Sequence, residues 1–198
     1  MTGLRLLSAP VAALAVHRGA SGLALVLFVL AVATDLLDGR LARRSGGASP
    51  LGGLLDHATD AAFVSLGLLA LAASGVVPLP LPLLVAAAFV QYTIDSRALR
   101  GSALRASALG RWNGVAYYVL LGIPVVRNGA GLGWPPDALV RALGWALVAT
   151  TLVSMGLRAL QLRALRRAQA VGLATNPGPL SGIEGGTDPG ARHLREEP

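Results

Sequence analysis

Asp35-Leu-Leu-Asp-Gly-Arg-Leu-Ala-Arg43, followed after a glycine-containing break by Gly52-Gly-Leu-Leu-Asp-His-Ala-Thr-Asp60, is the stretch that decides the fold of this 198-residue chain. It holds four of the ten acidic residues in the sequence. Apolar sequence lies on both sides, since residues 19–34 and 61–94 contain no charged residue. Carboxylates among membrane-type segments are costly and by default mark a functional site. The stretch therefore predicts a functional site in a membrane protein.

The composition supports the membrane class. Hydrophobic residues make up 54% of the chain and charged residues 14%, with a mean hydropathy of +0.61. A soluble domain normally carries about 25% charged residues. The net charge of +7 comes from arginine alone, and the arginines lie at the ends of apolar stretches, which favours a membrane face over a nucleic-acid partner. The absence of cysteine excludes disulfides and thiolate metal sites. The first apolar run lacks a cleavage site, so no signal peptide is predicted.

The apolar stretches predict an all-α membrane protein with six transmembrane helices. The first two are expected at about residues 1–17 and 19–44, and the last two at about 112–126 and 138–157. The third and fourth lie between residues 50 and 94 and are separated by a glycine and proline turn near residues 75–82. The first is short, because about 20 apolar residues are needed to cross a bilayer, and a short interfacial segment is expected there. Residues 1–169 form the predicted membrane domain, and the Gly- and Pro-rich residues 170–198 are predicted to be a disordered cytoplasmic tail.

The arginines predict the orientation in the membrane. Connections on the side of the aspartates hold Arg40, Arg43, Arg44, Arg97, Arg100, Arg105, Arg111, Arg158, Arg163, Arg166 and Arg167. The opposite connections hold only Arg18, Arg127 and Arg141. Because positive loops stay in the cytoplasm, the aspartates and both termini are predicted to face it. A multi-pass protein of the cell (inner) membrane with a cytoplasmic site is expected.

The four aspartates are predicted to converge. In an antiparallel hairpin turning near residue 47, Asp35 and Asp60 each lie roughly 15–17 Å from the turn, and Asp38 and Asp56 roughly 9–12 Å from it. Each pair also shares a helical face. Four facing carboxylates would repel one another unless cations bind them, and oxygen ligands favour Mg²⁺ or Mn²⁺. His57 points away from Asp56 and is interpreted as a packing residue.

Two such ions suit phosphoryl chemistry, because they neutralise charge on the attacking and leaving oxygens. Gly39, Ala42 and Gly52 are small enough to let a ligand approach the backbone. The guanidinium of Arg43 can donate two parallel hydrogen bonds to a phosphate. Small residues also simply pack membrane helices, and for Gly53 the two interpretations have equal weight.

The spacing D-x₂-D-G-x₂-A-R-x₈-G-x₃-D-x₃-D resembles the signature of the CDP-alcohol phosphatidyltransferase family, with every fixed position filled. The resemblance implies transfer of a phosphatidyl group from a CDP-lipid, usually CDP-diacylglycerol, to an alcohol, with release of CMP. It implies two metal ions on Asp35, Asp38 and Asp56, and Asp60 at the metal site as general base. Gly39, Ala42, Arg43 and Gly52 would surround the CDP moiety. The T-x-x-R of many members matches Thr2 and Arg5, which the resemblance also assigns to the CDP-binding residues. A homodimer is expected from the resemblance alone.

The acceptor is predicted from a second arginine group. Arg97, Arg100, Arg105 and Arg111 lie on the side of the aspartates, in a segment similar to one in phosphatidylglycerophosphate synthases. Arg111 stands where those enzymes have a lysine. The group favours glycerol 3-phosphate, with inositol phosphate or another alcohol as the alternative, although positive-inside topology explains any single arginine equally well. Tyr117 and Tyr118 are interpreted as an aromatic belt.

A proton-coupled transporter is the alternative from a different class, with the aspartates as a proton relay. It predicts carboxylates distributed through the bilayer midplane. In this sequence they cluster near one face, beside Gly39 and Arg43, so the transferase is favoured.

Overall fold

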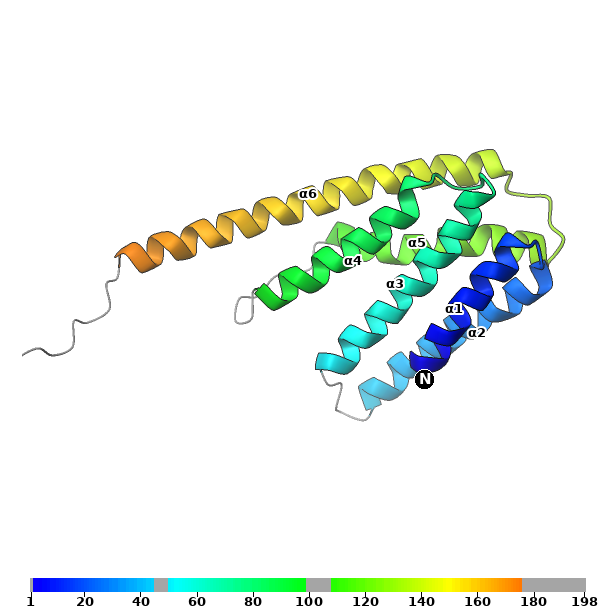
Figure 1. The fold of residues 1–198 in the computed structure, drawn as a ribbon, viewed down its shortest axis with the longest axis horizontal. Helices are drawn as coiled ribbons and strands as arrows, with labels where there is room; N and C mark the ends of the chain where they lie inside the picture. The colour runs from blue at the N-terminus through cyan, green and yellow to red at the C-terminus, as the bar shows by residue number, and fades with distance from the viewer. Residues whose placement is uncertain (1, 45–49, 99–107, 176–198) are drawn as a thin grey trace, which may run out of the picture. The chain divides into compact units, whose positions relative to one another are not determined.

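The computed structural model describes the backbone of residues 2–44, 50–98 and 108–175, and side chains within residues 5–37, 53–94 and 109–167. Over these residues the chain forms six helices and no strand (Figure 1). They are α1 (Thr2–His17), α2 (Ser21–Arg44), α3 (Pro50–Ala73), α4 (Pro80–Ala98), α5 (Ala108–Gly129) and α6 (Asp137–Thr175). The predicted all-α class is therefore confirmed.

Local sequence explains several helix boundaries. Pro50 is the first residue of α3, where its fixed φ suits a helix start. At the other end, Gly75 has a φ of 72° and the amide of Val76 donates to the carbonyl of Leu71 at 2.9 Å, as in a Schellman ending. The helix α6 continues to Thr175, past the predicted boundary at residue 169, because its arginine, alanine and glutamine residues favour helix. Residues 176–198 of the predicted tail lie outside the described residues.

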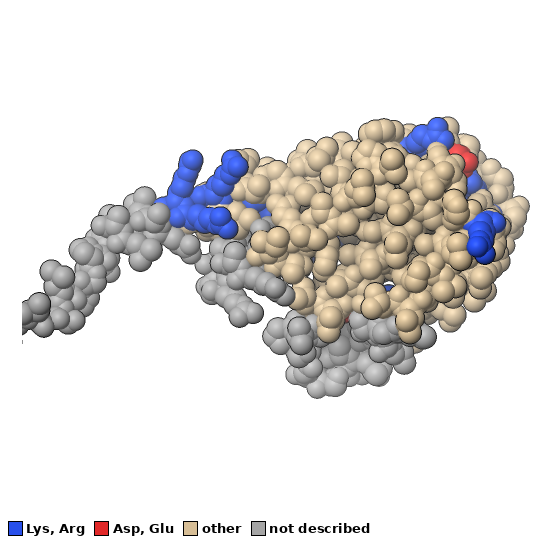
Figure 2. Space-filling model, in the orientation of Figure 1, with Lys and Arg blue, Asp and Glu red and all other residues tan. Residues whose placement is uncertain are grey.

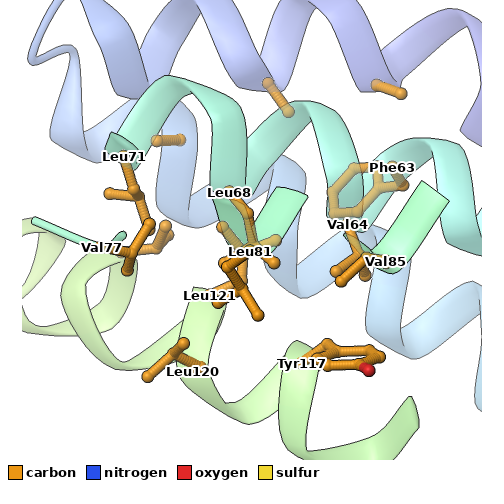
Figure 3. Close-up of a cluster of buried hydrophobic side chains, with 14 of the residues drawn as sticks. Phe63, Val64, Leu68, Leu71, Val77, Leu81, Val85, Tyr117, Leu120 and Leu121 are labelled. Carbon is orange, nitrogen blue, oxygen red and sulfur yellow. The ribbon is translucent and has the colours of Figure 1, made fainter. Parts of the chain in front are cut away.

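The chain divides into two units, Met1–Leu162 and Arg163–Pro198. In the first unit α3 packs against α1, α4 and α5, while α2 packs against α1 and α5. Figure 3 shows side chains of the core between α3, α4 and α5. Leu68 and Leu81 are fully buried there, and Leu121 is 2% exposed. The aspartate-bearing helix α3 therefore forms the centre of the bundle.

Small residues bring α1 close to its neighbours. Ala9, Ala12 and Ala15 are buried, and they recur at helical spacing on the face that also carries Arg5. Small side chains allow helix backbones to approach closely in apolar surroundings. The alanine face therefore sets α1 deep enough for Arg5 to reach the aspartates of α2 and α3.

Two glycines allow α5 to pack closely against α2. A Cβ at Gly122 would lie 2.7 Å from the Phe28 ring, and one at Gly129 would lie 2.7 Å from Leu25 Cβ and 3.1 Å from the Ser21 carbonyl oxygen. The two glycines are seven residues apart and so share one helical face. At Gly129 two of the three nearest atoms, Leu25 Cβ and the Ser21 carbonyl oxygen, cannot swing away as the end of a long side chain can.

We expect Gly129→Ala to lower the free energy of unfolding by about 1–3 kcal/mol, because it overpacks the α2–α5 contact. The measurement is thermal unfolding of the purified protein in detergent micelles. Gly114→Ala on the same helix is the matched control, since no atom of the described part of the chain lies within 4 Å of its added Cβ. The control is expected to unfold at the wild-type temperature or slightly above it, because alanine favours helix over glycine. Equal losses in both variants would contradict the close packing.

The surface of the first unit is strongly apolar. Among the described residues more large apolar side chains are exposed than buried, including Leu23, Val26, Val29 and Leu30 along α2. Figure 2 shows a face with few charged residues over the helices. Two helical stretches, Gly53–Ala73 and Asp137–Arg167, are long and apolar enough to cross a membrane by length and composition. Arg5–His17, Ser21–Leu37 and Pro80–Ile94 are shorter apolar helices.

Candidate active site

Three of the four predicted aspartates meet at one place. Carboxylate oxygens of Asp35 on α2 and of Asp56 and Asp60 on α3 all lie within 4.8 Å of one another. The side chains are 40%, 34% and 24% exposed respectively. Asp56 and Asp60 are one helical turn apart, so both project toward Asp35 from the same face of α3. The predicted convergence across the two helices is confirmed for these three residues.

A buried guanidinium lies at the centre of this aspartate cluster. Arg5 Nη1 is 2.5 Å from Asp60 Oδ1, 3.2 Å from Asp35 Oδ1 and 3.2 Å from Asp56 Oδ1. The Arg5 side chain is 1% exposed. Because α1 packs against both α2 and α3, Arg5 reaches carboxylates from both helices. The predicted role of Arg5 in binding CDP stays a prediction, whereas its contact with all three aspartates was not predicted.

Tyr118 on α5 completes the surroundings of Asp60. Its hydroxyl donates to Asp60 Oδ1 at 3.0 Å, and its ring stacks on Phe63 of α3 with centroids 6.5 Å apart. The neighbouring Tyr117 is buried, and its hydroxyl is 2.6 Å from Thr151 Oγ1 on α6. The interpretation of both tyrosines as an aromatic belt was therefore wrong. Adjacent residues on a helix face different directions, and the sequence could not show which faced the aspartates.

For most of the other predicted site residues, the side chains lie outside the described residues. Thr2, Asp38, Gly39, Ala42, Arg43, Gly52 and Arg97 lie on helices, but their side chains are outside the described residues. Arg100 and Arg105 lie outside the described residues altogether. Arg111 is exposed near the start of α5. The structure thus brings together Asp35, Asp56, Asp60 and Arg5, and it leaves the CDP and acceptor sites as predictions.

His57 lies outside the aspartate cluster. Its Nδ1 is 2.8 Å from the Gly53 carbonyl oxygen, and its ring stacks on Tyr92 of α4 with centroids 6.2 Å apart. The Arg158 guanidinium of α6 lies over the Tyr92 ring, 4.8 Å from its centroid. These contacts join three helices and agree with the predicted packing role of His57.

The residues of the cluster fit a hard divalent cation. Their donor atoms are all carboxylate oxygens, which Mg²⁺ and Mn²⁺ prefer. With a Mg–O distance of about 2.1 Å, oxygens on opposite sides of an ion are about 4.2 Å apart, which is close to the 4.8 Å spread of the cluster. The Arg5 guanidinium shows that these carboxylates already gather around a positive charge. The structure therefore supports a divalent cation site, while the identity and number of ions stay predictions.

Removing the Tyr118 hydroxyl should weaken the positioning of Asp60. We expect Tyr118→Phe to lower kcat of the predicted transferase reaction about tenfold, because a partner of a predicted ligand carboxylate is lost, with little change in the KM for the predicted lipid donor. Tyr117→Phe is the matched control, because its hydroxyl bonds Thr151 instead. It should cost about 1 kcal/mol of stability and leave kcat unchanged. Equal kcat in the two variants would contradict the role of Tyr118.

The fold and the site define an apolar, all-helical protein with an aspartate cluster suited to a divalent cation. The family model of the CDP-alcohol phosphatidyltransferases matches residues 1–156, and the chain belongs to this family. The family membership predicted from the aspartate signature is thereby confirmed.

One curated relative adds to this. The CDP-diacylglycerol–glycerol-3-phosphate 3-phosphatidyltransferase of Cereibacter sphaeroides (strain ATCC 17023) is 36% identical over 138 residues, covering 65% of this chain. The match spans 62% of the length of that relative. No solved structure matches the chain significantly.

Proposed function

We propose that this protein is a phospholipid-synthesising phosphatidyltransferase that moves the phosphatidyl group of CDP-diacylglycerol to glycerol 3-phosphate and releases CMP. The observation that carries the proposal is the convergence of Asp35, Asp56 and Asp60, three fixed positions of the family signature, from two helices. The family match over residues 1–156 and the named activity of the Cereibacter relative support the same reaction.

The proposed metal centre holds two ions, Mg²⁺ or Mn²⁺, on Asp35, Asp38 and Asp56, with Asp60 at its edge. Bound cations would supply charge neutralisation at the attacking and leaving oxygens. The protein's own part is to hold oxygen ligands on two helices that are fixed by the packing of α1 and α5. The three described carboxylates already lie within 4.8 Å of one another, which supports a site that needs little rearrangement.

Asp60 is the proposed general base. The acceptor hydroxyl gives its proton to the Asp60 carboxylate as its oxygen bonds the phosphorus of the phosphatidyl group, and the bond from that phosphorus to CMP breaks. A base must lie within hydrogen-bond reach of the hydroxyl. The bond from Tyr118 falls on Oδ1 of Asp60 and fixes the orientation of the carboxylate.

The proposed donor site lies along the hairpin. Gly39, Ala42, Arg43 and Gly52 would surround the CDP moiety, with Thr2 and Arg5 contributing from α1. Among the described residues, no atom lies within 4 Å of the place where a Cβ on Gly53, next to this set, would stand. The open space beside α3 supports the approach of a ligand there.

The proposed acceptor site uses Arg97, Arg100, Arg105 and Arg111 to bind the phosphate of glycerol 3-phosphate. The named substrate of the Cereibacter relative favours this alcohol. Inositol phosphate also carries a phosphate group and is the alternative acceptor.

We further propose that residues 1–169 form a domain of six transmembrane helices in the cell (inner) membrane, with the active site and a 170–198 tail in the cytoplasm. The exposed apolar side chains of the first unit support this, because large apolar patches on soluble proteins are rare. Helix α3, with 24 residues, is about 36 Å long, which exceeds the roughly 30 Å of a bilayer core. A homodimer is proposed from the family alone.

The test is CMP release by the purified protein. It is given CDP-diacylglycerol and Mg²⁺ or Mn²⁺ with glycerol 3-phosphate, inositol phosphate, serine or phosphatidylglycerol in separate reactions. We expect the highest rate with glycerol 3-phosphate and none after chelation of the metal. A preference for inositol phosphate would reassign the acceptor, and no CMP with any acceptor would contradict the transferase.

A further inference from the structure

A single arginine nitrogen lies where a cation would bind the carboxylates. Arg5 Nη1 is between 2.5 and 3.2 Å from one oxygen of each of Asp35, Asp56 and Asp60. An Mg²⁺ ion bound to the same oxygens would stand about 2.1 Å from each of them. Arg5 Nη1 and an ion bound to these three oxygens would then be two positive charges in contact with the same atoms. The Arg5 nitrogen and a divalent ion therefore compete for these three oxygens.

Charge explains why the cluster needs a cation at all times. Three ionised aspartates carry −3 and Arg5 carries +1, so the described cluster has a net charge of −2. Without Arg5 the carboxylates would repel one another at close range while half removed from water. With a divalent ion in its place the carboxylates keep a positive partner of higher charge. Arg5 thus offsets the charge of the cluster in the metal-free protein, and the cluster no longer needs it once a cation binds.

The position of Arg5 near the start of α1 allows its guanidinium to move out of the aspartate cluster. It lies in the first turns of α1, which begins at Thr2, so its long side chain is near the end of the helix. The alanines that fix α1 against the bundle, Ala9, Ala12 and Ala15, come after it. A change of rotamer can therefore withdraw the guanidinium without moving the packed part of α1.

We infer that Arg5 is an internal counter-ion that holds the aspartate cluster together in the metal-free protein and is expelled from it when a divalent cation binds. The inference rests on the proposed function only for the nature of the cation. It makes Arg5 and the cation competitors for the same carboxylates, so cation binding and the position of Arg5 are linked. In the metal-free protein the charge of the aspartate cluster is offset by an arginine, and in the loaded protein by the metal.

The test compares Arg5→Met with the wild type by thermal unfolding and by Mn²⁺ titration followed by electron paramagnetic resonance. In EDTA the variant should unfold at least about 6 °C below the wild type, because a buried ion cluster has lost its cation. In saturating Mn²⁺ the two proteins should unfold at the same temperature, since Arg5 does not contribute to the loaded cluster. The variant should bind Mn²⁺ at least about fivefold more tightly, because a competitor is gone.

Two further variants keep the test decisive. Arg5→Lys retains a positive charge and should restore both the unfolding temperature in EDTA and the wild-type Mn²⁺ affinity, even where Arg5→Met can be purified only with Mn²⁺. Arg127→Met is the matched control, because Arg127 pairs with Asp137 at 2.7 Å, outside the aspartate cluster. Its loss of stability should be the same with and without Mn²⁺.

The outcomes separate this inference from the proposed function. If the Arg5→Met deficit persists undiminished in saturating Mn²⁺, Arg5 belongs to the loaded site and the inference is wrong. Unchanged Mn²⁺ affinity in Arg5→Met would overturn it as well. A wild-type protein that binds no Mn²⁺ at all would instead remove the metal centre on which the proposed reaction depends.

Discussion

Asp60→Asn is expected to lower turnover about 10²- to 10⁴-fold, the usual contribution of a general base. The amide is nearly isosteric with the carboxylate and its oxygen can still accept the bond from Tyr118, so the packing of α3 against α5 should persist. The amide that replaces the carboxylate cannot take the proton of the acceptor hydroxyl. The measurement is CMP release with glycerol 3-phosphate under saturating CDP-diacylglycerol.

Binding measurements complete this prediction. CDP-lipid should still bind Asp60→Asn, because the residues proposed to surround the CDP moiety are unchanged. Mn²⁺ should also still bind, with Asp35 and Asp56 in place. Wild-type turnover in Asp60→Asn would remove Asp60 from the role of base, whereas loss of Mn²⁺ binding would show that it acts mainly as a metal ligand.

Asp35→Ala is expected to abolish turnover through loss of the metal. Asp35 is the described member of the cluster that comes from α2, so without it the remaining described oxygens belong to α3 alone. We expect Mn²⁺ affinity to fall by more than the roughly 10- to 100-fold that follows loss of an outer-shell partner. The same paramagnetic titration measures this directly, and excess Mn²⁺ should restore part of the activity.

Asp137→Ala provides the control for Asp35→Ala. Asp137 is also an aspartate on a helix and pairs with an arginine, but it lies outside the aspartate cluster. Its side chain is 49% exposed, so its removal should cost at most about 1 kcal/mol of stability and leave turnover intact. If both variants lost activity equally, the effect could not be assigned to the metal site.

Much of the fold could be read from the sequence because membrane-type helices are encoded locally. Apolar length, the proline at residue 50 and the glycine at residue 75 set where α3 begins and ends. The pairing of Asp56 with Asp60 follows from the period of a single helix. Their meeting with Asp35 follows from the antiparallel direction of α2 and α3. None of these inferences required knowledge of contacts with other helices.

The sequence by itself determined the six helices, the family and three of the residues that form the aspartate cluster, because each depends on spacing along one helix or one hairpin. Only the tertiary structure decided that Asp35, Asp56 and Asp60 contact Arg5 and that Asp60 accepts a hydrogen bond from Tyr118. Arg5 and Tyr118 come from α1 and α5, and the depth and rotation of these helices are set by the buried alanines of α1 and by Gly122 and Gly129 of α5. Such packing sums many weak contacts between distant segments, and no local pattern records its result.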